Sequence, residues 1–99
     1  MAKDILFLLA MPFEDEGMLW LCRDCALLEG ALLANPHWSQ EIEIRRIGFA
    51  RPRRELIELL GEDGQWLPVL VRGQGAPLRD PVAIAEDLAA RFGGARPHP

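Results

Sequence analysis

Two cysteines separated by two residues are the feature that most constrains this chain. They are Cys22 and Cys25, in the sequence Cys-Arg-Asp-Cys, and they are its only cysteines. The spacing suits a short disulfide loop. A helix that starts at the first cysteine exposes that thiol and places the second thiol one turn inside. The pair therefore predicts thiol chemistry, provided that the flanking segments fold as a strand and a helix.

The segments around the cysteines predict a βαβ unit. Residues 5–10 form a continuous apolar run, typical of a strand buried on both faces. Residues 26–34 are apolar almost all round and predict a well-buried helix, which an Asn-Pro pair ends. The alternating residues 41–45 predict a strand with one exposed face. Ile47 and Phe49 break that alternation, which indicates a bulge or an edge strand.

The middle of the chain predicts a further helix and a strand that begins with a proline. Residues 52–60 carry an apolar stripe at helical spacing, and a glycine follows them. Residues 66–71 predict a strand with Pro68 near its start, and residues 77–78 a short fourth strand. Trp66 is expected to be at least half-buried in the core, as is the tryptophan after the first helix.

The end of the chain predicts a helix with clear boundaries. Asp80 suits the N-cap, Pro81 suits the first helical position, and Gly93 ends the helix. A chain of 99 residues is typical of one domain. We therefore expect a single domain over residues 1–93, followed by a frayed C-terminal tail over residues 94–99.

Composition and charge exclude several classes of protein. With 49% hydrophobic and 26% charged residues, the chain is typical of a folded soluble domain and not of a disordered one. Its net charge of −4 argues against an electrostatic nucleic-acid binder. The apolar run Ile5–Met11 falls short of the ~20 residues of a membrane helix, and the acids after it do not suit a signal peptide. We expect a cytoplasmic protein without nucleic-acid or membrane partners.

The order of these features resembles the thioredoxin-like superfamily over nearly the whole chain, and its length is closest to that of glutaredoxins. The resemblance implies an α/β, thioredoxin-like fold with a four-stranded mixed sheet flanked by three helices. Residues 67–71 and 80–84 also resemble the N-terminal domain of glutathione transferases. More closely, Ala2–Leu8, Cys22–Leu27 and Arg96–Pro99 are similar to a small bacterial family of unknown function with this fold. That likeness implies no reaction.

We interpret the cysteines as the dithiol of a small thiol–disulfide oxidoreductase. Cys22 attacks as the thiolate and Cys25 resolves the mixed disulfide. Two alternatives stay open: a non-enzymatic binding module that keeps the pair as a remnant, and a metal or iron–sulfur carrier. His37 follows Cys22 by 15 residues across a helix, which is on the order of 20 Å. We therefore assign no metal ligand and no firm cofactor within one chain.

The resemblance also implies residues that contact a substrate. It implies a cis bond before Pro68, near the Cys22 sulfur, that exposes the backbone of Leu67 to a protein or small-molecule thiol or disulfide. It admits glutathione as a ligand, with Asp80 facing the glutathione ammonium group. That role of Asp80 competes with its role as a simple helix cap.

Sheet geometry adds two arginines to these residues. Both strands of a βαβ unit end at the same sheet edge, so Arg51 and Arg53 are expected near Cys22, where either one binds a carboxylate in forked geometry. Trp20 is expected to contact the substrate or to pack within its loop. The acids at residues 14–16 are expected to raise the pKa of a nearby thiol. The substrate, the electron donor and the oligomeric state stay open.

Overall fold

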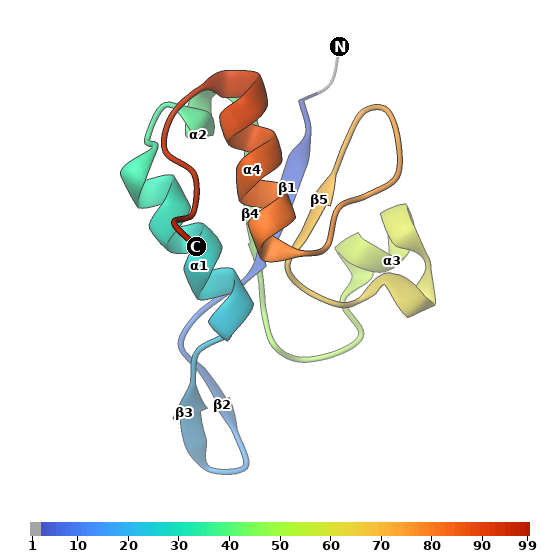
Figure 1. Ribbon diagram of the computed structural model, residues 1–99. Helices are drawn as coiled ribbons and strands as arrows, with labels where there is room; N and C mark the ends of the chain where they lie inside the picture. The colour runs from blue at the N-terminus through green and yellow to red at the C-terminus, as the bar shows by residue number, and fades with distance from the viewer. Residues whose placement is uncertain (1–2) are drawn as a thin grey trace.

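The fold is known from a computed structural model that describes residues 3–99 (Figure 1). Ala2, part of the N-terminal stretch that carries the family resemblance, lies outside the described residues. In chain order the elements are β1 (Ile5–Leu9), β2 (Phe13–Asp15), β3 (Met18–Trp20), α1 (Arg23–Ala34), α2 (Trp38–Glu41), β4 (Glu43–Ile47), α3 (Arg54–Leu60), the 3-10 helix η1 (Glu62–Gly64), β5 (Val69–Val71) and α4 (Pro81–Phe92).

The strand β1 is the centre of a three-stranded sheet with the order β4-β1-β5, parallel to β4 and antiparallel to β5. Leu6 and Leu8 pack with α1 and α4, whereas Phe7 packs on the opposite face with Leu56 of α3. All three β1 side chains are fully buried, as the apolar run predicts. Figure 1 shows the resulting layers, with α1 and α4 on one side of the sheet and α3 on the other.

The expected four-stranded mixed sheet flanked by three helices is wrong. Leu78 makes only an isolated bridge to Leu70, so the main sheet has three strands. The Arg72 guanidinium donates to the carbonyl oxygen of Ala76, and Pro77 has no N–H, so the ladder does not extend beyond that bridge. The strands β2 and β3 form a separate two-stranded sheet, and α2 is a fourth α-helix within residues 3–99.

Several expected boundaries also shift. The second strand of the βαβ unit covers 43–47 instead of 41–45, because α2 occupies the preceding residues, and β4 is an edge strand as expected. The third strand begins at Val69, and Trp66 before it is 63% exposed rather than buried. The helix α1 is only half-buried, because one face lies against the sheet while Leu33 on another face is 84% exposed. Within residues 3–99, no helix has the length and apolar character needed to cross a membrane.

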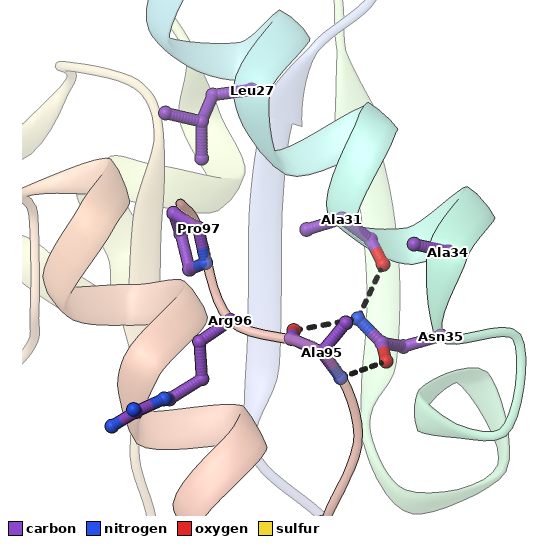
Figure 2. A pocket seen from close by; sticks show the side chains of 7 residues that line it. All are labelled: Leu27, Ala31, Ala34, Asn35, Ala95, Arg96 and Pro97. Atoms are coloured by element: carbon purple, nitrogen blue, oxygen red, sulfur yellow. Dashed lines mark hydrogen bonds between the residues drawn. The ribbon is translucent and has the colours of Figure 1, made fainter. Parts of the chain in front are cut away.

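The C-terminal tail is held at Ala95, where the sequence predicts fraying (Figure 2). The buried Asn35 amide donates to the carbonyl oxygens of Ala31 and Ala95 over 2.9 and 3.1 Å, and Ala95 N–H donates to Asn35 Oδ1 over 2.7 Å. The tail lies across α1 and encloses an apolar pocket of about 210 Å³ beside Leu27. One side chain therefore caps α1 and fastens the tail.

Replacing Asn35 with alanine is expected to lower the free energy of unfolding by about 2 kcal/mol, because three hydrogen bonds are lost at a buried position. Urea denaturation followed by tryptophan fluorescence measures this change. His98→Ala is the control, since its ring accepts or donates only to its neighbour Pro99. A loss below about 0.5 kcal/mol for Asn35→Ala would mean that the tail is not held by this contact.

Candidate functional site

Cys22 is the N-cap of α1, as the sequence predicts. Its backbone is extended, with φ −81° and ψ 114°, and its Sγ accepts the N–H of Cys25 over 3.2 Å. Its own N–H donates to Met11 Sδ over 3.1 Å, which fixes the approach of the chain to the helix. The thiol is half-buried and free. A sulfur at this position lies at the N-terminus of the helix, which is the positive end of the helix dipole.

Cys25 lies one turn inside the helix and is fully buried in the core. Its Sγ accepts the N–H of Leu9, the last residue of β1, over 3.4 Å. Burial, above all, raises the pKa of Cys25 to about 12, and the hydrogen bond and charge of Cys22 and the charge of Asp24 add to the rise. Asp24, rather than the acids at residues 14–16, is the carboxylate that contributes. Cys25 is therefore a neutral thiol at physiological pH.

Arg53 is a buried cation beside this dithiol. It is only 7% exposed, and its guanidinium donates to the carbonyl oxygens of Phe49 and Gln65 over 2.7 Å each. The Gln65 side chain accepts the Arg53 backbone N–H over 2.8 Å and so holds the residue from a second direction. The Nε atom of Arg53 is buried and has no hydrogen-bond partner within residues 3–99. The side chain is thus held by neutral acceptors alone.

The two arginines expected near the thiols differ in burial. Desolvation, above all, lowers the pKa of Arg53, and the charge of Arg51 adds to this, while the negative forms of Cys25 and Cys22 act in the opposite direction. Arg53 is therefore within electrostatic reach of both sulfurs. Arg51 is exposed, and its guanidinium lies 4.7 Å from the centre of the Trp66 ring.

Two aromatic side chains that sequence reasoning missed connect the site to its surroundings. Phe13, at the base of the β2–β3 hairpin, stacks on Phe49 with ring centres 4.5 Å apart. Phe49 lies in the loop after β4, and the Arg53 guanidinium lies 5.7 Å from the centre of its ring. Residues of this loop and Trp66 line an open pocket of about 440 Å³, with Arg51 and Arg53 among them.

The remaining expected site residues have defined places. The Leu67–Pro68 bond is cis, as expected; Pro68 is buried, and Leu67 packs against both core clusters. The proximity of this bond to the Cys22 sulfur stays a prediction. Asp80 caps α4 by accepting the N–H of Ala83 over 2.9 Å, so its helix-cap role is confirmed. Trp20 is 44% exposed in β3, and its Nε1–H donates across the hairpin to the Asp15 carbonyl.

A metal centre is not assembled in the described part of the chain. Among residues 3–99, no three His, Cys, Asp or Glu side chains come together in a way that suits a metal ion. His37 instead interacts through Nε2 with the carbonyl oxygen of Gly93 over 3.0 Å, at the far end of α4. The soft donor atoms described at this place are the two thiols and the Met11 thioether, whose Sδ lies 3.1 Å from Cys22 N.

Cys22 is expected to react with iodoacetamide at least about 100-fold faster than Cys25 at pH 8, because a thiol with a pKa of about 12 is only ~10⁻⁴ thiolate there. Mass spectrometry of the tryptic peptides over time measures both rates. Alkylation in concentrated urea is the control and should bring the two rates together. Equal rates in the folded protein, or faster modification of Cys25, would reverse the assigned positions.

Replacing Arg53 with glutamine is expected to slow the alkylation of Cys22 at pH 7 about threefold, because a positive charge near the thiolate is removed. Arg53→Lys keeps the charge and should keep most of the rate. The matched control is Arg54→Gln, an exposed arginine one residue along the chain. If the lysine variant reacts as slowly as the glutamine variant, then the packing of Arg53 and not its charge is responsible.

Comparison with protein families gives a match over most of the chain. Residues 3–95 match the family described as Protein of unknown function (DUF3088). No curated protein and no solved structure matches the chain significantly. The matched range contains both cysteines, the β2–β3 hairpin, the loop with Arg51 and Arg53, and the strand β5 with the preceding Pro68. It ends at Ala95, where Asn35 holds the tail. The chain therefore belongs to the DUF3088 family.

Proposed function

We propose that the chain is a small thiol–disulfide oxidoreductase of thioredoxin-like type that uses Cys22 and Cys25. The observation that carries the proposal is a half-exposed sulfur at the N-cap of α1 directly above a buried one, with the Cys25 N–H donating to the outer sulfur. A helix N-terminus favours negative charge, and the thiolate is the reactive form of a thiol. The proposed compartment is the cytoplasm, where a dithiol is kept reduced.

The proposed exchange has two steps. The Cys22 thiolate attacks a disulfide, forms an S–S bond to one substrate sulfur and expels the other as a thiolate. Cys25 then loses its proton and attacks Cys22 Sγ, which forms the Cys22–Cys25 disulfide and releases the second substrate thiolate. Two electrons pass from the dithiol to the substrate disulfide. The same steps run in reverse when an external dithiol reduces the protein again.

The electrostatics of the pair suit this order of attack. The hydrogen bond and the charge of Cys22 both raise the pKa of Cys25, and both are lost once the Cys22 sulfur is bound in a mixed disulfide. The loss of these two causes makes Cys25 easier to ionise at the moment when it is needed. Arg53, within electrostatic reach of both sulfurs, favours negative charge on either one.

The proposed substrate contacts lie around the outer sulfur. The backbone at Leu67 and Pro68 would pair with an extended substrate, and Trp20 would pack against it. Of the two arginines, the exposed Arg51 would bind a carboxylate, including that of glutathione, whereas the buried Arg53 guanidinium already donates to two carbonyl oxygens. For Asp80 the proposed contact with a glutathione ammonium group comes second to the helix cap that it already forms.

A non-enzymatic binding module is the second candidate, because the β2–β3 hairpin exposes apolar side chains to solvent. The two candidates differ in the chemistry of the dithiol. A binding module needs no reversible redox couple, whereas an oxidoreductase needs one within the range of cellular thiols.

A redox titration is expected to show one reversible two-electron couple in the wild type and none in Cys22→Ser. In Cys25→Ser the second step is blocked, so a mixed disulfide with a disulfide substrate should accumulate and release its substrate on reduction. Cys22→Ser is the matched control and should trap nothing. The absence of a reversible couple in the wild type would leave the binding module as the surviving function.

A further inference from the structure

We infer that the substrates are protein disulfides in extended segments that are apolar and basic beside the cysteine, and that the β2–β3 hairpin binds these segments. The inference rests on the proposed function and names its substrate class. Figure 1 shows the hairpin projecting from the layered part of the molecule, just before α1 begins at the dithiol. The hairpin therefore occupies the surface that a partner meets first when it approaches Cys22.

The hairpin exposes four large apolar side chains in a row. The exposed fractions are 57% for Met18, 71% for Leu19, 44% for Trp20 and 63% for Leu21. Since side chains alternate along a strand, four consecutive apolar residues place apolar surface on both faces of the hairpin. A two-stranded hairpin alone is only marginally stable in water, and clustered exposed apolar side chains mark interaction sites. This surface therefore suits a partner that covers it.

The hairpin also offers a backbone edge. In the part of the chain that the structure describes, β3 pairs only with β2, so its other edge is open. Along an antiparallel ladder, hydrogen-bonded pairs alternate with pairs that are not hydrogen-bonded. Asp15 and Met18 form the pair next to the two-residue turn, so Glu14 and Leu19 form a pair of the second kind. The N–H and C=O groups of Leu19 therefore point outward. An extended segment that pairs there needs only about 10 Å, or about three residues, to bring its cysteine level with Cys22.

A second apolar surface lies in the loop after β4 and the segment before β5. Phe49 and Trp66 are 37% and 63% exposed, and they line the pocket of about 440 Å³ there. The Phe13–Phe49 stack joins this loop to the base of the hairpin, so the second surface adjoins the first. Six of the nine exposed large apolar side chains lie in these two surfaces. Apolar surface that extends over both a hairpin and a loop fits a polypeptide better than a small thiol.

The negative charge of the hairpin turn favours a partner segment with basic residues. The acids Glu14, Asp15 and Glu16 lie at the exposed hairpin turn, and none of the ion pairs formed within residues 3–99 involves them. A basic flank on the bound segment would pair with these carboxylates. A second copy of this chain fits less well, because each copy has a net charge of −4 and brings an equally acidic hairpin.

The test compares Leu19→Ser, at 71% exposure, with the matched control Leu33→Ser, which changes an 84% exposed leucine in the last turn of α1. The probes are a synthetic peptide disulfide with leucines and lysines beside its cysteine, and the small disulfide 4,4′-dithiodipyridine. Single-turnover reactions with the reduced protein give the second-order rate constants. Leu19→Ser should slow the peptide reaction about 10-fold and leave the small disulfide unchanged, since it removes a binding contact and not a reacting group.

Charge is tested with the same assay. The double variant Glu14→Gln/Glu16→Gln should slow the reaction with the lysine peptide and not with a peptide whose lysines are replaced by glutamates. Added salt should reduce this difference, because the contacts are exposed. The Leu33→Ser control should match the wild type for every probe.

The outcomes separate this inference from the proposed function. If the wild type reacts with dithiodipyridine and with the peptide but Leu19→Ser reacts equally fast, the hairpin does not bind the substrate and the inference fails alone. If the wild type reacts with neither disulfide, the proposed function fails with it. A concentration-dependent dimer that Leu19→Ser abolishes would show that a second copy covers the hairpin, and it would overturn the inference as well.

Discussion

The hydrogen bond from Leu9 N–H to Cys25 Sγ joins the end of the central strand to the first turn of α1, and the candidate site depends on it. The strand β1 is buried on both faces, so its end is one of the best-fixed points of the fold. Cys25 is held at that point, and Cys22, three residues earlier, reaches the surface as the helix cap. Of the intervening residues, Met11 and Phe13 still pack against the core, and Phe13–Trp20 form the projecting hairpin. The depth of one thiol thus determines the exposure of the other and the place where the hairpin leaves the fold.

Local signals account for the parts of this arrangement that the sequence predicts correctly. The apolar run of β1 predicts burial on both faces of the strand. The Asp80-Pro81 pair predicts the start of α4, where Asp80 accepts the N–H of Ala83. The CxxC spacing predicts one outer and one inner thiol once a helix follows it, and Cys22 and Cys25 have those positions. In each case the deciding interactions lie within a few residues of one another along the chain.

The errors come from side-chain contacts that residue type alone does not reveal. Arg51, Arg53 and Arg54 are alike in sequence, and only the carbonyl groups of Phe49 and Gln65 select Arg53 for burial. The expected fourth strand at residues 77–78 forms no ladder, because the Arg72 side chain donates to the Ala76 carbonyl oxygen. The sequence contains a local signal for the hairpin, because Glu16 and Gly17 stand as a two-residue turn between short segments with apolar residues. In the structure both turn residues adopt positive φ values.

Arg53, like the Cys25 thiol, is a buried ionisable group of the candidate site. A guanidinium held only by neutral carbonyls, with Nε unpaired, loses hydration without gaining a counter-charge. Negative charge on a nearby sulfur offsets part of that cost. Cys25 is a poor place for this charge, because burial raises its pKa to about 12. The outer sulfur is only half-buried and accepts the Cys25 N–H. In the proposed exchange the first attack therefore falls to Cys22, and the formation of a neutral disulfide leaves Arg53 with its carbonyl partners alone.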